Sequence, residues 1–307
     1  MKSIYKYLIG FCVVAILTIC CVCIMLNKNS TNRIITFGAE PVYGLVHMIW
    51  DSHFDIDTIS QFTDTVPELV TLKDKSIYDS IYTKTINGRP DLVGIADRLS
   101  TLIEMRDGRV KSAYDAYSKF WDDNADVLNK YLNDTEQVYK QTPTKLNDLE
   151  NNLAIFFDTP LIKYANYFVP FVGNGSGGVS IGDGAIVGIN VSREHTYEDV
   201  LFYISVVFHE WNHAMFTKSE LFSKYSQKMD PKEFLLFQEV LATAYQALVL
   251  EAIGGDINQP LYDNAEYDRL ARKFIPVLKA SFEQGVKLND AWIVEYWQPI
   301  VETYLEN

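Results

Sequence analysis

Residues 201–215 read LFYISVVFHEWNHAM, and their apolar residues recur at helical spacing on two sides. One side of such a helix carries Leu201, Ile204, Phe208, Trp211 and Met215. The nearly opposite side carries Phe202, Val206, His209 and His213. A helix that is apolar on both sides belongs in a protein core. The segment therefore predicts a central helix over about 196–217 whose second face ends at two histidines.

The same segment contains the pattern His-Glu-x-x-His, formed by His209, Glu210 and His213. Residues four apart lie one turn apart on one helix face, so both imidazoles can reach a single cation. Glu210 lies beside them, where it can hold a metal-bound water. Zinc suits this set because it accepts imidazole nitrogens tetrahedrally and lowers the pKa of its water toward about 7. The alternative is a pair of core histidines with other partners, although unpaired polar groups on a doubly buried helix are costly.

A third metal ligand must come from another segment. Cysteine is excluded, because all four cysteines lie within residues 12–23. The best candidate is Glu239, 26 residues after His213 on a predicted helix over 231–253. There it shares a polar column with Thr243 and Gln246 amid apolar neighbours, and a carboxylate in such surroundings needs a cation.

Three alternatives to this third ligand stay open. Glu251 and Glu220 are weaker candidates, and Glu220 follows the histidine helix too closely to fold back easily. Glu239 could also be an ordinary surface residue of an imperfectly amphipathic helix.

The remaining chain is mostly helical with one small sheet. The sequence predicts helices over 42–140, strongest at 112–140, then a break at Pro143 and a further helix to Phe157. A glycine-rich loop at 173–178 precedes two β-rich runs, 179–181 and 185–191, which predict a hairpin. Further helices are expected over 260–284 and 288–305. The predicted class is α+β and predominantly helical.

The set of His209, Glu210, His213 and Glu239 resembles the zincin metallopeptidases of the gluzincin type, over roughly 175–255. The resemblance implies a zinc-dependent peptidase in which His209, His213 and Glu239 bind Zn²⁺ and Glu210 is the catalytic base. It also implies that the hairpin is the zincin edge strand, to which a peptide substrate adds as a further strand.

The sequence departs from the gluzincin pattern at one position. Thermolysin-like members carry an aspartate four residues after the third ligand, which orients a histidine ligand, and here that position is Thr243. A hydroxyl orients an imidazole more weakly than a carboxylate. The candidates for stabilising the oxyanion of the reaction are His195, Tyr197, Tyr245 and the tyrosines of the C-terminal helices.

Composition excludes one class of partner. The chain of 307 residues is 48% hydrophobic and 22% charged, in the range of a folded globular protein. It has 27 basic and 40 acidic residues, which gives a net charge of −13. Nucleic-acid binding is not expected, because phosphate neutralisation needs clustered lysine and arginine.

The N-terminus predicts attachment to a membrane. Lys2 and Lys6 precede an uncharged run from Tyr7 to Leu26, whose twenty residues span about 30 Å as a helix, the thickness of the hydrocarbon layer. An uncleaved signal anchor over 1–26 is expected. A lipoprotein signal at Leu17–Cys20 is the second choice, and a buried core helix is the third.

Residues 27–33 then form a tether, and 34–307 form one domain. The positive-inside rule places this domain outside the cytoplasm. The combined interpretation is a membrane-anchored zinc metallopeptidase acting on peptides or proteins. The rivals are a non-catalytic surface-binding module with a degenerate metal site, and a zinc hydrolase of another bond.

This topology can be tested on intact cells. Because the apolar run and its lysines place the body outside, an added protease should degrade it while the membrane is intact. A body that is cut only after lysis would contradict the predicted orientation.

Overall fold

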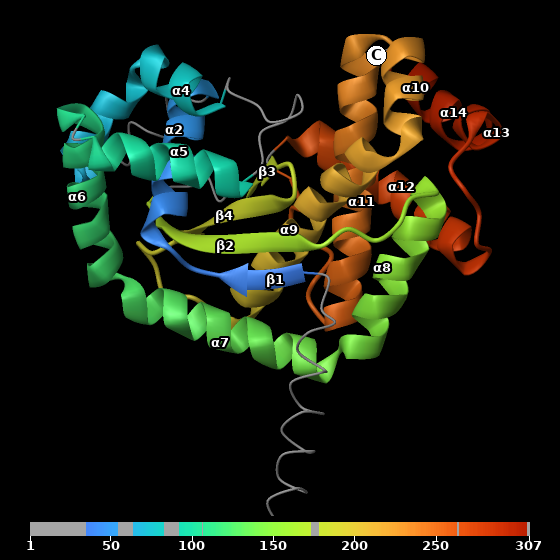
Figure 1. Cartoon of the computed structure of the whole chain (residues 1–307). Coiled ribbons are helices and arrows are strands. Elements are labelled where there is room, and N and C mark those ends of the chain that lie inside the picture. Colours follow the sequence, from blue (N-terminus) through green and yellow to red (C-terminus); the bar gives the residue numbers. More distant parts are fainter. Residues whose placement is uncertain are drawn as a thin grey trace, which may run out of the picture.

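A computed structural model describes residues 35–54, 64–82, 92–105, 107–172, 178–262 and 264–305. These residues form a mostly helical α+β fold with one sheet (Figure 1). In chain order the elements are β1 (Ile35–Gly38), α2 (Pro41–Phe54), η1 (Pro67–Lys73), α4 (Lys75–Tyr82), α5 (Leu92–Glu104), α6 (Gly108–Asp123), α7 (Ala125–Gln141), α8 (Pro143–Phe157), β2 (Tyr164–Phe171), β3 (Gly178–Ile181), β4 (Gly184–Asn190), α9 (Tyr197–Lys218), α10 (Glu220–Lys228), α11 (Pro231–Ile253), α12 (Ala265–Glu283), α13 (Asp290–Trp292), η2 (Ile293–Trp297) and α14 (Gln298–Leu305).

The sheet has four strands in the order β1-β2-β4-β3 among the described residues. β1, β2 and β4 run parallel, whereas β3 pairs antiparallel with β4 and lies at the edge. Every residue of β4 is buried, as expected for a parallel strand covered on both faces. The hairpin between β3 and β4 turns at Gly182, whose positive φ of 57° fits the first central position of a type II′ turn.

Helix α9 crosses the core behind the sheet, where it packs against β3, β4, α7 and α11 (Figure 1). A capping box starts it: the Thr196 hydroxyl accepts a hydrogen bond from the Asp199 N–H at 3.2 Å, and the Asp199 carboxylate accepts one from the Thr196 N–H at 2.8 Å. Fifteen of its residues are buried. Because both of its sides are covered, the direction of each polar side chain on α9 is fixed by packing.

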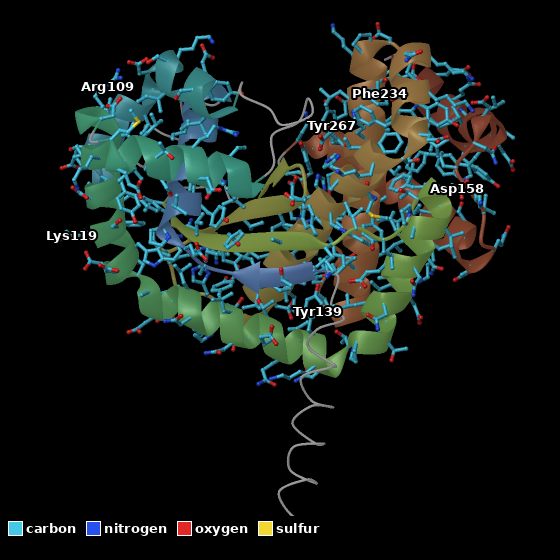
Figure 2. All side chains as sticks on the ribbon, in the orientation of Figure 1. Arg109, Lys119, Tyr139, Asp158, Phe234 and Tyr267 are labelled. Carbon is cyan, nitrogen blue, oxygen red and sulfur yellow. The ribbon has the colours of Figure 1, made fainter. Side chains whose placement is uncertain are left out.

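Aromatic contacts join α7, the sheet and α9. Tyr139 of α7, labelled in Figure 2, contacts Phe37 of β1 with ring centroids 5.2 Å apart. It also stacks on Phe208 of α9 at 6.2 Å. Residues far apart in sequence are thereby held in one hydrophobic core.

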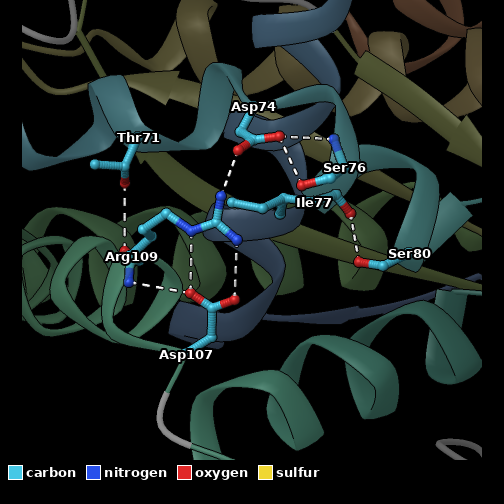
Figure 3. Close-up of polar contacts among 7 residues, drawn as sticks. All are labelled: Thr71, Asp74, Ser76, Ile77, Ser80, Asp107 and Arg109. Carbon is cyan, nitrogen blue, oxygen red and sulfur yellow. Dashed lines mark hydrogen bonds and ion pairs between the residues drawn. The ribbon is translucent and has the colours of Figure 1, made fainter.

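On the far side of the sheet, η1, α4 and α6 meet at Arg109 (Figure 3). Its guanidinium pairs with Asp74 and with Asp107, and its carbonyl accepts a hydrogen bond from the Thr71 hydroxyl at 3.3 Å. Hydrogen bonds from Ser76 and the charge of Arg109 hold the pKa of Asp74 below its ordinary value. These groups are solvent-exposed, so the network orients the element ends and adds little to stability.

Several predicted elements match the structure. α8 ends at Phe157, α9 lies within one residue of the predicted 196–217 at each end, and α11 has the predicted bounds 231–253. The β3–β4 hairpin lies where the two β-rich runs predicted it. The coarse class, α+β and predominantly helical, is therefore confirmed.

Other details differ from the prediction. The expected helix over 112–140 is two helices, α6 and α7, separated at Asn124, whose side chain donates to the Phe120 carbonyl at 2.8 Å and caps the first helix. The strands β1 and β2 and the short helix α10 were not predicted. α12 begins at Ala265 rather than 260, and the last predicted helix contains a π-helical segment, η2.

The predicted anchor over 1–26 and tether over 27–33 lie outside the described residues. Among the described residues, only α11 is long and apolar enough to span a membrane. However, 78% of its apolar window is buried within the fold, which is typical of a core helix. The single-domain assignment of 34–307 stays a prediction.

The structure also predicts a pH-dependent stability. Burial raises the pKa of Glu150, on α8, from 4.5 to about 7. The folded state therefore holds this proton more tightly than the unfolded state, and stability falls as pH rises from about 4.5 to 7, by about 3 kcal/mol in total. Glu150→Gln cannot ionise at this position. The melting temperature of the variant, measured relative to that of the parent, should therefore increase as pH rises from 5 to 8.

Melting curves of both proteins in a metal chelator measure this difference. Glu104→Gln, at an exposed position, is the control and should show no such trend. A melting difference between Glu150→Gln and the parent that is the same at pH 5 and pH 8 would contradict burial as the cause.

Candidate metal centre

Helix α9 presents its two histidines as a pair. His209 is only 5% exposed, and the ring centroids of His209 and His213 lie 4.8 Å apart. Their Nε2 atoms are 3.1 Å apart, so the two nitrogens point to the same place. This is the geometry expected of residues four apart on one helix face.

Helix α11 brings Glu239 to this pair. One carboxylate oxygen lies 3.5 Å from the His209 Nε2, and the other lies 3.6 Å from the His213 Nε2. Seven residues later on α11, Gln246 donates a hydrogen bond to the Ser205 hydroxyl at 3.4 Å. The later residue of α11 thus contacts the earlier residue of α9, which means that the two helices pack antiparallel.

The spacing of these atoms fits a metal ion. A tetrahedral ion with bonds of about 2.0–2.1 Å keeps its ligand atoms about 3.3 Å apart. The observed separations of 3.1, 3.5 and 3.6 Å bracket that value. One ligand atom from each of the three residues lies within 4.8 Å of the others. The structure thus brings together the three predicted ligands in a cluster that could hold a metal.

The charges of the cluster are balanced internally. Burial alone would raise the pKa of Glu239, but its close contacts with His209 and His213 outweigh burial and lower the pKa well below its ordinary value. Burial alone would lower the pKa of His213, but its hydrogen bond with Glu239 and the nearby carboxylates raise it. Glu239 is therefore held as an anion, the form in which a carboxylate binds a cation.

Glu210 lies on a different side of α9, against β3. Its side chain is buried, with 8% of its surface exposed, and the backbone N–H of Ser180 lies near its carboxylate. Burial raises the pKa of Glu210, while the nearby His209 and His213 partly oppose the rise. The structure thus places a second carboxylate next to the cluster, with a pKa that burial raises.

Tyr262, in the segment between α11 and α12, completes the surroundings of the cluster. Its ring stacks on His209 with centroids 5.9 Å apart, and it lies near the Glu239 carboxylate. Tyr262 also contacts Tyr267, which is labelled in Figure 2, with ring centroids 5.5 Å apart. Burial and the charge of Glu239 raise the pKa of Tyr262, so the hydroxyl keeps its proton.

Sequence reasoning did not single out Tyr262. The only signal was its place among the tyrosines of the C-terminal segment. The individually named candidates have other contacts: His195 bonds to Tyr131 at 2.7 Å, and Tyr197 is 50% exposed at the start of α9. Tyr245 lies near Glu150 in the core.

The position of Thr243 matches its predicted place in the polar column. Glu239, Thr243 and Gln246 share one face of α11. This face contacts α9 through Glu239 and Gln246. The buried Thr243 hydroxyl and the Nδ1 atom of His209 have no hydrogen-bond partner within the described part of the chain. The imidazole is thus not oriented by the carboxylate that thermolysin-like sites use.

The two weaker ligand candidates lie apart from the cluster. Glu251 sits three turns further along α11 and pairs with Lys279 of α12 at 3.2 Å. Glu220 is the first residue of α10. Neither belongs to the group of three residues that could hold a metal. Glu239 also cannot be an ordinary surface residue, because its side chain is only 17% exposed and contacts both histidines.

Comparison with known proteins adds no family. No protein-family model matches the chain, and neither the curated proteins nor the solved structures contain a significant match. The case for the site therefore rests on the geometry of this chain.

Replacing Glu239 tests the metal centre. Glu239→Gln exchanges an anion for a neutral amide, which is a poorer ligand for a dication. We expect zinc affinity to fall by more than about 100-fold, and the rise of the melting temperature on adding zinc to be lost.

Glu251→Gln, on the same helix but in an exposed ion pair, is the matched control and should bind zinc as the parent does. Zinc titration with a chromophoric chelator measures both variants. Parent-like affinity of Glu239→Gln would remove Glu239 from the ligand set.

Proposed function

We propose that this protein is a zinc-dependent metallopeptidase of the gluzincin type. One observation carries the proposal: a buried carboxylate, Glu210, lies beside three converging ligand atoms without being one of them. A structural metal site has no use for such a residue, whereas hydrolysis needs a base there. The order His209, Glu210, His213 and a later glutamate on the next long helix supports the same class.

Zinc is the proposed ion. Two imidazole nitrogens and one carboxylate are a set that catalytic zinc sites use, with a fourth position left open. When bound, zinc polarises a substrate carbonyl and promotes ionisation of a water molecule near neutral pH. The residues of this chain then have separate tasks: His209, His213 and Glu239 hold the ion, and Glu210 handles protons.

Glu210 is proposed as the general base. Its carboxylate takes a proton from the water that attacks the peptide carbonyl, and then delivers that proton to the nitrogen of the leaving amine. The raised pKa supports this role, because a carboxylate that holds a proton more readily also accepts one more readily during the reaction. Glu239, with its lowered pKa, is suited to remain an anion throughout.

Peptides or proteins are the proposed substrates. β3 is the edge strand of the sheet, packs against α9, and reaches Glu210 through Ser180. An extended peptide can add to such an edge by backbone hydrogen bonds, which places its carbonyl groups along α9. This mode of binding recognises the backbone of a peptide more than its side chains.

The proposed location is the outer side of a membrane. The basic residues and twenty-residue apolar run before the described fold support a signal anchor, with a lipoprotein signal as second choice. The net charge of −13 supports a protein that does not bind nucleic acid. A metallopeptidase at this location acts on extracytoplasmic peptides or proteins.

Glu210→Gln tests the proposed function. The amide keeps the size of the side chain but cannot accept the proton, so peptide cleavage should fall by about 10²–10⁴-fold while zinc binding and the melting temperature persist. Cleavage of a mixed peptide library by the zinc-loaded full chain, followed by mass spectrometry, measures the change.

Two outcomes would contradict the proposal. Full activity of Glu210→Gln would exclude Glu210 as the base. Stoichiometric zinc in a parent protein that cleaves no peptide would instead favour a binding module or a hydrolase of another bond.

A further inference from the structure

The edge strand β3 makes an unusually close contact with Glu210. A Cβ atom placed on Gly178 would lie 2.7 Å from both the Cγ and an oxygen of Glu210, and 3.0 Å from its carboxyl carbon. Real Cβ atoms essentially never approach other heavy atoms this closely. The Glu210 side chain therefore occupies space that is open only because residue 178 is glycine.

Two residues later, β3 makes a second contact with the same side chain. Ser180 lies opposite Ala185 in the hairpin, one position from the Ile181–Gly184 pair that closes the two-residue turn. Opposed pairs in an antiparallel ladder alternate between hydrogen-bonded and non-hydrogen-bonded, so the N–H of Ser180 points away from β4. That outward N–H faces the Glu210 carboxylate, whose pKa it lowers.

A third contact fixes β3 itself. The hydroxyl groups of Ser180 and Tyr164 lie 3.0 Å apart, and Tyr164, at the start of β2, is only 1% exposed. β3 is thereby tied to the buried part of the sheet through a side chain as well as through its ladder with β4. The contacts of Gly178 and Ser180 with Glu210 thus come from a strand held in a fixed place.

We propose that Gly178 and Ser180 are positioning residues for Glu210: the glycine leaves room for the carboxylate, and the backbone N–H holds one of its oxygens. The other carboxylate oxygen then remains for proton transfer next to His209 and His213. This proposal rests on the proposed role of Glu210 as the base, and it adds the two residues that set its direction.

A double-mutant cycle tests the close contact without any activity measurement. Gly178→Ala should lower the melting temperature by about 5 °C, because the added methyl group meets Glu210. In a Glu210→Ala background the obstructing atoms are gone, and most of that loss should disappear. Gly108→Ala, where an added Cβ meets nothing within 4 Å, is the matched control. An equal loss in both backgrounds would overturn the proposal.

The backbone contact has its own pair of variants. Proline is tolerated on an edge strand where the N–H points outward, so Ser180→Pro removes the donor to Glu210 while the ladder with β4 persists. Ser180→Ala keeps that donor and removes only the bond to Tyr164. We expect kcat of the zinc-loaded full chain to fall by about 100-fold in Ser180→Pro with zinc affinity unchanged, and to fall much less in Ser180→Ala, which keeps the N–H.

The outcomes separate this proposal from the proposed function. A fall in kcat of the same size in both Ser180 variants, or a rise in KM alone, would overturn positioning through the N–H. If the parent cleaves no peptide but the melting cycle shows coupling between Gly178 and Glu210, the contact stands and the peptidase assignment fails. If cleavage is robust and the cycle shows no coupling, the peptidase assignment stands and this inference fails.

Discussion

The structure depends on one constraint: an antiparallel pair of buried helices, α9 and α11, meets through polar side chains inside an apolar core. Gln246 bonds Ser205 at one level, and Glu239 meets the two histidines at the next. Buried polar groups are expensive unless they are satisfied, so these contacts fix the register between the helices. Sliding one helix along the other would leave a buried anion facing apolar side chains.

The sheet covers the other side of α9, the side on which Glu210 lies. Since His209 and Glu210 are adjacent on a helix, their side chains point about 100° apart, and only one of them can face α11. Glu210 therefore faces the sheet edge, where β3 brings a backbone N–H, that of Ser180, near the buried carboxylate. The long crossover from β1 to β2 builds the parallel sheet that carries this edge strand. The site thus needs both the helix pair and the sheet.

Local patterns predicted the helices and the three converging residues, but not the partners that come from far away. α9 and α11 are long segments that are apolar on both sides, and the His-Glu-x-x-His spacing implies a shared face, so their prediction needed no tertiary information. β1 has only four residues, and its partner β2 begins 126 residues after β1 ends, so pairing and not local propensity defines it. The contacts of Tyr262 and Ser180 depend on the path of a loop and the register of a hairpin. Such contacts are decided by packing, which no local pattern encodes.

Three glutamates show how the surroundings of a carboxyl group set its pKa and therefore the role that suits it. Glu150 has no compensating charge among the causes of its shift, and burial raises its pKa to about 7. Glu239 is also largely buried, yet the two imidazoles lower its pKa and keep it an anion. For Glu210, burial raises the pKa while the histidines and one backbone N–H oppose the rise. Where neighbouring carboxyl groups are driven apart in pKa, the lower one is suited to ligation and the higher one to proton transfer. The same two histidines lower the pKa of Glu239 by direct contact and limit the rise in the pKa of Glu210. One pair of residues therefore acts on both carboxyl groups, in the directions that suit ligation for Glu239 and proton transfer for Glu210.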